Sequence, residues 1–236
     1  MARIWLDVPF DEKDKAKAAG ARWDPNAKRW YAPYEVMNKL TAWKGLPPLP
    51  ELLPGEDRTF GGNGLFVDMV PSSCWFTNIR SCVDKRDWER LRRMVTSRAG
   101  NRCEVCGAGP DRTKEIWMET HERWSYDPAQ RIQTLRRLIC LCTSCHRATH
   151  YGFAQIKGLE AEAFAHLMKI NNWNKTVAKV HVESAIQTWR SRCMSTWSLD
   201  LSILTGAGVA VSKPPDASGR REVAQNQTEA VRRQEH

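Results

Sequence analysis

The chain has 236 residues, 42% of them hydrophobic and 27% charged, and its formal net charge is +9. This balance is typical of a globular protein and excludes disordered and fibrous chains. No apolar run approaches the ~20 residues that a helix needs to cross a bilayer, and the first ten residues hold no long apolar stretch of a secretory signal. We therefore expect a cytoplasmic protein without a membrane partner, long enough for one large domain or two smaller ones.

Residues 1–44 have the pattern of a small βαββ domain. Residues 4–8 alternate like a strand, and residues 12–19 favour a short helix for which Asp11 is the expected cap. Two Trp-bearing segments joined by a turn signal predict a hairpin after this helix. The motif VPF…EKD.AK..GARWD…..RWY.P, within residues 3–33, resembles a short domain of unestablished function that is often attached to plasmid primase-like and other DNA-processing proteins.

Composition divides the rest of the chain into a linker, a second domain and a tail. Residues 45–62 are rich in Pro and Gly, which predicts a linker. Residues 63–204 contain strand and helix patterns, whereas residues 205–236 lack periodicity and predict a disordered tail. Within the second domain we expect strands over 66–70, 115–124, 138–142 and 197–204, and helices over 84–99, from near Cys145, over 160–170 and over 176–193.

The positive charge is concentrated in one part of the sequence. Residues 80–157 hold sixteen basic and nine acidic side chains, and most of the basic ones are arginines. Such a surface gains free energy by releasing counterions from a polyanion, although a solvated basic face without a partner would have the same composition. If the partner is DNA or another nucleic acid, we expect its phosphates to contact Arg90, Arg93, Arg123, Arg136, Arg137 and Arg147.

Four of the eight cysteines form two CxxC pairs, Cys103 with Cys106 and Cys142 with Cys145, separated by 35 residues. Each CxxC turn can direct two sulfurs at one metal, and two such turns complete a tetrahedral set of thiolates around Zn²⁺. Without an export signal, eight cysteines indicate metal ligands and buried thiols rather than disulfides. A thioredoxin-type redox site uses only one CxxC in a βαβ context, so we predict a structural zinc site.

Three histidines have a spacing that suits a second metal site. His146 and His150 are four residues apart directly after the last CxxC, which places both imidazoles on one face of the predicted helix. His121 lies on the predicted strand between the two CxxC pairs. If zinc holds this strand against the helix, His121 faces the other two histidines and all three can ligate one cation.

The run CEVCG…METHERW…LICLCTSCHRATHYG, residues 103–152, resembles the HNH endonuclease domain, which has the ββα-metal nuclease fold. The flanking segments extend the resemblance over residues 64–204. It implies an α+β protein in which a zinc-stapled, HNH-like ββα-metal core with extra helices follows the small βαββ domain. It also implies that the substrate is DNA and that His121, His146 and His150 hold a catalytic divalent cation such as Mg²⁺, Mn²⁺ or Zn²⁺.

The implied reaction is hydrolysis of a phosphodiester bond. The cation binds the scissile phosphate and stabilises the leaving 3′-oxygen, while a neighbouring base deprotonates the attacking water. The resemblance assigns catalytic roles to His121, Glu122 and His146, with Glu122 at the position of the family's histidine base. This departure leaves three alternatives: Glu122 is the base, His121 is the base, or the site no longer cuts. Glu119 shares a strand face with His121, whereas Glu122 lies opposite unless a bulge turns it. The family's base-orienting Asn is absent, and Arg137 stands near its place.

A non-catalytic zinc-containing module that binds nucleic acid or another protein is the alternative function. Such a module shares the structural zinc but has no need for three converging histidines. A zinc nucleobase deaminase requires H-x-E and P-C-x-x-C, whereas His121 and Glu122 are adjacent here and Leu141 precedes Cys142. A zinc protease requires HExxH, and the segment HERWS lacks the second histidine. We therefore predict a metal-dependent endonuclease that cleaves DNA through an HNH-like site.

Overall fold

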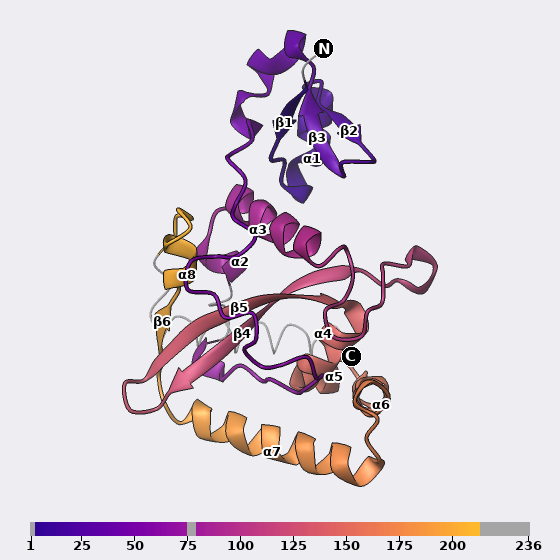
Figure 1. Cartoon of the computed structure of the whole chain (residues 1–236), viewed down its shortest axis with the longest axis vertical. Helices are drawn as coiled ribbons and strands as arrows, with labels where there is room; N and C mark the ends of the chain where they lie inside the picture. Colours follow the sequence, from indigo (N-terminus) through magenta and orange to yellow (C-terminus); the bar gives the residue numbers. More distant parts are fainter. Residues whose placement is uncertain (1–2, 75–78, 213–236) are drawn as a thin grey trace, which may run out of the picture.

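The computed structural model describes residues 3–74 and 79–212 of the chain. Two three-stranded sheets with helices around them form a mixed α+β fold, which confirms the predicted class (Figure 1). One sheet belongs to an N-terminal unit and the other to the larger C-terminal part, and helix α3 (Lys85–Arg98) lies between them. None of the helices in these two described ranges combines the length and the apolar character that a bilayer crossing requires.

The N-terminal unit has the predicted order of strand, helix and hairpin. Strand β3 pairs antiparallel with both β1 and β2, so that the sheet order is β1-β3-β2. The small core under this sheet is built from buried side chains such as Leu6, Ala16 and Leu40. The elements of this unit are β1 (Ile4–Leu6), η1 (Phe10–Glu12), α1 (Lys13–Ala18), β2 (Arg22–Asp24), β3 (Arg29–Ala32), η2 (Tyr34–Lys39) and η3 (Thr41–Trp43).

The predicted Asp11 cap is wrong. The chain enters α1 through the 3-10 helix η1, which places Glu12 at the N-cap position without a side-chain hydrogen bond to the helix. Asp11 instead forms an ion pair with Lys85 at the start of α3. The carboxylate therefore joins the N-terminal unit to the rest of the chain rather than stabilising its own helix.

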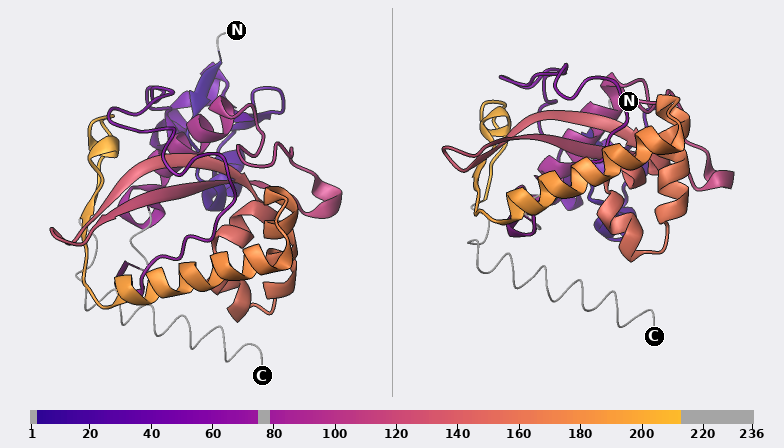
Figure 2. Two further views of the ribbon diagram at one scale, coloured as in Figure 1. Left: turned by 60° about the horizontal axis from the view of Figure 1, so that its bottom comes forward. Right: turned by 90° about the horizontal axis from the view of Figure 1, so that it is seen from below.

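The C-terminal part contains a long hairpin surrounded by helices (Figure 2). The predicted helices over 84–99, 160–170 and 176–193 are confirmed, and Asp84 and Asn174 cap two of them by accepting from backbone N–H groups in the first turn. Besides α3, the elements are η4 (Ser72–Cys74), α2 (Ile79–Cys82), η5 (Arg112–Lys114), β4 (Met118–Asp127), β5 (Ile132–Cys142), α4 (Thr143–Thr149), α5 (Tyr151–Ile156), α6 (Glu160–Asn171), α7 (Lys175–Cys193), β6 (Ser198–Asp200) and α8 (Ser202–Thr205).

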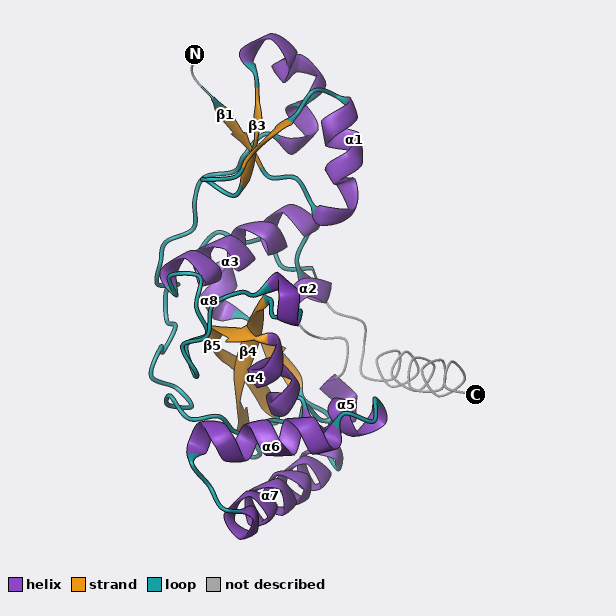
Figure 3. Ribbon diagram, turned by 90° about the vertical axis from the view of Figure 1, so that its right-hand side faces the viewer, coloured by secondary structure: helices purple, strands orange, loops and turns teal. Residues whose placement is uncertain are grey.

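The β4–β5 hairpin is buried on both faces, which explains its nearly continuous apolar sequence at 138–142. Leu138 and Cys140 pack into a core with α3 and α8, whereas Ile139 and Leu141 pack into a second core with α4, α5 and α6. Successive side chains of a strand point to opposite faces, so one apolar run supplies both cores. Figure 3 shows the result, with α3 on one side of the hairpin and α6 and α7 on the other.

All four predicted strands of this part differ from the structure. Those over 115–124 and 138–142 exist as β4 and β5, but β4 is shifted by three residues and β5 begins six residues earlier, at Ile132. Residues 66–70 form no strand, because their backbone is bound by groups outside any sheet: the Val67 N–H donates to His181 Nε2 at 3.0 Å, and the Asp68 N–H donates to the Thr149 carbonyl at 3.0 Å. The strand expected over 197–204 is confined to β6, which pairs parallel with β5. It ends where Asp200 accepts from the Ser202 N–H and α8 begins.

The segments expected to be a linker and a tail both pack against the C-terminal part. Leu53 and Glu56, inside the predicted linker at 45–62, are buried. In the predicted tail, Val209 is buried and Val211 pairs with Val83. The chain therefore stays ordered beyond residue 204, and the prediction for residues 213–236 lies outside the described residues.

Candidate metal centres

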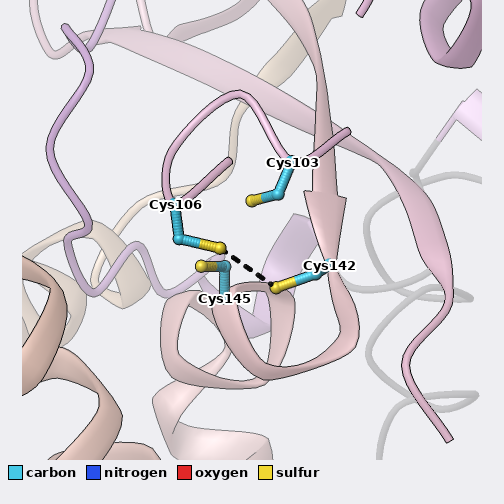
Figure 4. A group of neighbouring side chains, drawn as sticks. All are labelled: Cys103, Cys106, Cys142 and Cys145. Atoms are coloured by element: carbon cyan, nitrogen blue, oxygen red, sulfur yellow. Dashed lines mark hydrogen bonds between the residues drawn. The ribbon is translucent and has the colours of Figure 1, made fainter. Parts of the chain in front are cut away.

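The four predicted zinc ligands converge in one cluster (Figure 4). Cys103 and Cys106 lie in the loop after α3, Cys142 ends β5, and Cys145 lies in the first turn of α4. Their four sulfur atoms lie within 4.8 Å of one another, and three of the four residues are buried. Gly107 adopts a φ of +73°, which lets the loop turn back directly after the second sulfur.

The chemistry of this cluster fits Zn²⁺. Hydrogen bonds from Cys142 and Cys145 lower the pKa of the Cys103 thiol, and the neighbouring Cys103 sulfur raises the pKa of Cys142 to about 12. Without a cation, one thiolate therefore suppresses ionisation of its neighbours, whereas a tetrahedral thiolate set is a common structural Zn²⁺ site. His166, on α6, places Nε2 3.2 Å from the Cys145 sulfur and so supports the cluster from outside.

The three predicted histidines also meet. His121 lies in β4, His146 lies in α4, and His150 forms the junction between α4 and α5. One ring nitrogen from each lies within 4.8 Å of the other two, and the ring centroids are 4.5 to 5.3 Å apart. Strand and helix therefore bring together imidazoles that are separated by 29 residues in the sequence.

The environment of His121 fits a metal ligand. The residue is 3% exposed, and among the described residues neither Nδ1 nor Nε2 has a hydrogen-bond partner. A buried polar group without a partner is costly, and coordination of a cation would remove that cost. Burial lowers the pKa of His121 well below 6.5 and that of His150 to about 3, so both imidazoles are neutral, as metal ligands must be.

Glu119 supports the cluster through His146. A Glu119 carboxylate oxygen lies 3.0 Å from His146 Nδ1 and accepts a hydrogen bond from it, which leaves Nε2 of that ring for a cation. Burial favours the neutral acid, but the contacts with His146 and Thr143 outweigh it and lower the pKa of Glu119. The residues fit a cation held by three imidazoles with a carboxylate behind one of them.

Glu122 occupies a different environment from His121. Its carboxylate accepts a hydrogen bond from the Ile79 N–H of α2 at 3.0 Å, and burial raises its pKa. The hairpin does contain a bulge, but the register shifts between Arg123 and Trp124, after Glu122. The bulge therefore does not turn Glu122 onto the face of His121, and its predicted role as base stays a prediction.

The predicted arginine face is divided among several internal contacts. Arg123 is buried and donates to the Gly62 carbonyl at 2.8 Å, and Arg137 is buried and pairs with Glu104 at 3.1 Å. Burial and the charge of Arg137 lower the pKa of Arg123 to about 10. Arg123 therefore binds the loop over residues 57–62, and Arg137 binds Glu104 in the loop that carries Cys103 and Cys106. Because both arginines are buried, neither lies on a surface that could bind phosphates.

The other four predicted arginines pair with acidic residues. Arg90 pairs with Asp87 on its own helix, and Arg93 pairs with Asp7 of the N-terminal unit. Arg136 and Arg147 keep 41% and 33% of their side chains exposed, beside Asp57 and Glu162 respectively. Of the six, Arg136 and Arg147 are the two on the C-terminal part that retain the most accessible guanidinium groups.

Comparisons with known proteins cover the N-terminal unit. Residues 3–44 match a family described as "Domain of unknown function (DUF5710)". Two proteins named DNA primase TraC, both from Escherichia coli, are similar: one is 49% identical over 55 residues, which is 23% of this chain and 5% of the primase, and the other is 50% identical over 44 residues, which is 18% and 3%. The chain thus spans a small fraction of these curated relatives, and no solved structure matches it.

These matches agree with the predicted resemblance of the N-terminal unit. For the C-terminal part, the function is inferred from the geometry of the two clusters.

Two supporting residues were not predicted as parts of a metal site. His166 has no sequence spacing that links it to the cysteines, and only the packing of α6 against α4 brings it to Cys145. Glu119 carries a usable signal, because it lies two residues before His121 on the same face of β4.

Proposed function

We propose that this protein is a metal-dependent endonuclease that cleaves DNA phosphodiester bonds through an HNH-like site. The observation that carries the proposal is the convergence of His121, His146 and His150 around the unpartnered ring nitrogens of His121. The order of elements supports it, since β4, β5 and α4 give a hairpin followed by a helix, with the cysteine cluster at their junction. The similarity to proteins named DNA primase supports an association with nucleic acid.

The residues divide the work in the proposed reaction. The three histidines hold the divalent cation, and Glu119 fixes the tautomer and orientation of His146. When bound, a divalent cation supplies charge stabilisation for the scissile phosphate and the leaving 3′-oxygen. Glu122, at the position of the family's base, is proposed to accept a proton from the attacking water; because its carboxylate lies off the His121 face, Glu119, on that face, is the competing base. Arg136 and Arg147, which retain exposed side chains, are proposed to contact phosphates on either side of the cut.

A plasmid-nicking assay tests this proposal. Wild-type protein should convert supercoiled plasmid to nicked circles in Mg²⁺ or Mn²⁺, and His146→Ala should reduce the rate by at least about 100-fold because one of three cation ligands is lost. His181→Gln is the matched control, because His181 lies on α7 outside the cluster. Cleavage that survives His146→Ala, or that falls equally in His181→Gln, would reject the site.

The base is tested separately from the cation site. Glu122→Gln keeps the size of the side chain and removes its negative charge, so we expect cation binding to persist while cleavage falls by roughly 100-fold. If Glu119→Gln stops cleavage without weakening cation binding and Glu122→Gln does not affect the rate, Glu119 is the base instead. If the wild-type protein binds DNA and the cation but never cleaves, the non-catalytic zinc module is the correct function.

A further inference from the structure

A cavity of about 240 Å³ lies between the N-terminal unit and helix α3, away from both metal centres. Three of its lining residues are aromatic: Phe10, Trp23 and Trp30. Its volume lies below the ~300–1,000 Å³ of pockets for drug-sized ligands, so it suits one planar ring system rather than a large cofactor. Phe10 is 76% exposed and Trp23 is 49% exposed, so these rings contribute little to the core.

Two of the lining aromatic side chains are neighbours on the sheet. Trp23 and Trp30 are paired across β2 and β3, with their ring centroids 5.5 Å apart in an edge-on arrangement. Because opposite residues in an antiparallel pair share a face, both rings are presented to the same side of the sheet. Phe10 follows on η1, and the ammonium group of Lys13 lies 4.0 Å from its ring centroid. The exposed rings therefore offer surfaces for stacking, and Lys13 adds a cation over one of them.

The charged lining is strongly positive. One carboxylate, Glu89, faces five cationic side chains. Glu89 pairs with Arg92, and Arg29 and Arg93 share the buried carboxylate of Asp7, which does not line the cavity. Among the residues that the structure describes, the remaining two cations, Lys13 and Lys28, have no acidic partner within ion-pair distance, so their charge is available to a ligand.

We propose that this groove binds single-stranded DNA, with an unpaired base against Phe10 and Trp23 and the backbone phosphates along Lys13 and Lys28. Stacking on aromatic rings inside a positively charged groove is how proteins bind single strands without reading sequence. An acidic peptide would satisfy the cations but would leave the exposed rings in water. The choice of DNA over RNA rests on the proposed endonuclease function, whereas the single-strand preference rests on the groove alone.

Fluorescence anisotropy of labelled dT12 with the full-length chain tests the proposal. The measurement uses the His146→Ala background without added divalent cation, so that binding is independent of cleavage. Phe10→Ala should weaken dT12 binding by roughly 5- to 100-fold, because one stacking contact is lost. Tyr34→Ala is the matched control, since Tyr34 is also 76% exposed in the same unit but does not line the groove.

The charge contribution has its own variant pair. Lys28→Glu should reduce the slope of log Kd against log salt concentration by about 0.7, which is the value for one phosphate contact on a single strand. Lys39→Glu is the control, because Lys39 is exposed but does not line the groove, and it should leave the slope unchanged. Equal effects within either pair, or tighter binding of a 12-base-pair duplex than of dT12, would overturn the groove. Tighter binding of rU12 would overturn DNA as its occupant. Failure of plasmid nicking alone would refute the proposed function and not the groove.

Discussion

Removal of the Arg98 side chain tests whether α3, the segment before residue 57 and the β4–β5 hairpin are stabilised as one piece. Arg98 donates to both carboxylate oxygens of Glu56 at 2.6 and 2.7 Å, and the two side chains are 1% and 0% exposed. Arg98 also donates to the Leu138 carbonyl at 2.7 Å, and Glu56 accepts from the Leu138 N–H at 2.9 Å. The pair therefore binds the backbone of β5, the strand that ends at Cys142 in the cysteine cluster.

Arg98→Ala leaves the Glu56 carboxylate buried without its cation. Loss of one partner from a buried pair costs about 3–5 kcal/mol of unfolding free energy. With a urea dependence of roughly 2 kcal/mol per molar, the unfolding midpoint should fall by about 1.5–2.5 M. Arg92→Ala is the matched control on the same helix, because the Arg92–Glu89 pair leaves the Arg92 side chain 44% exposed, and such surface pairs contribute only ~0.2–1 kcal/mol.

Urea unfolding at neutral pH, followed by far-UV circular dichroism, measures both variants under one condition. The double change Arg98→Met with Glu56→Leu removes both charges and should recover part of the lost stability, because apolar residues of similar size replace buried pairs well but leave the Leu138 N–H and carbonyl without these partners. A midpoint loss in Arg98→Ala no larger than in Arg92→Ala would refute the reasoning. So would a double variant as unstable as the sum of its single changes.

Three further predictions concern the two metal centres and the joint between the units. Cys103→Ser should abolish the zinc content measured by atomic absorption and lower the Tm, because zinc-binding free energy is part of folding, whereas Cys193→Ser, outside the cluster, should retain zinc. Glu119→Gln should weaken Mn²⁺ binding in calorimetry by about 10- to 100-fold, since His146 loses its partner; an unchanged affinity would contradict this role. Burial alone would raise the pKa of Asp7, but Arg93, the Leu46 N–H and Arg29 outweigh burial and lower that pKa below 3.8. The ionised carboxylate therefore stabilises the folded protein fully above about pH 3.8, and this stabilisation is lost as the pH falls through the lower folded-state pKa. Thermal unfolding should therefore show Asp7→Asn less stable than wild type at neutral pH, with the difference closing on acidification; a constant difference would count against the ion pair.

Sequence patterns predicted the elements whose signals are local. The helix over 84–99 has a capping Asp84 and a clear apolar face, and the structure places it at Lys85–Arg98. The CxxC spacing predicted the cysteine cluster, and the HxxxH spacing after it predicted the histidine cluster. In each case the residue types and their separation restrict the geometry before any long-range contact forms.

The failures concern segments whose structure depends on distant partners. Residues 66–70 have the composition of a strand, but their N–H groups are bound by His181 and the Thr149 carbonyl, which no local pattern encodes. The segment 45–62 looks like a linker because it is rich in Pro and Gly, yet Glu56 meets Arg98 forty-two residues away. Arg123 and Arg137 were predicted to contact phosphates at the surface, because no local pattern shows that they are buried. Their partners, the Gly62 carbonyl and the Glu104 carboxylate, lie far away in the sequence.

Helix α4 has only seven residues, yet it contributes Cys145 to the cysteine cluster and His146 to the histidine cluster. Cys145 of the cysteine cluster and His146 of the histidine cluster are consecutive residues, joined by one peptide bond. No other residue lies between these two members of the clusters. If the cysteine cluster holds Zn²⁺, loss of that ion would also disturb the first turn of α4, and with it the position of His146 in the histidine cluster.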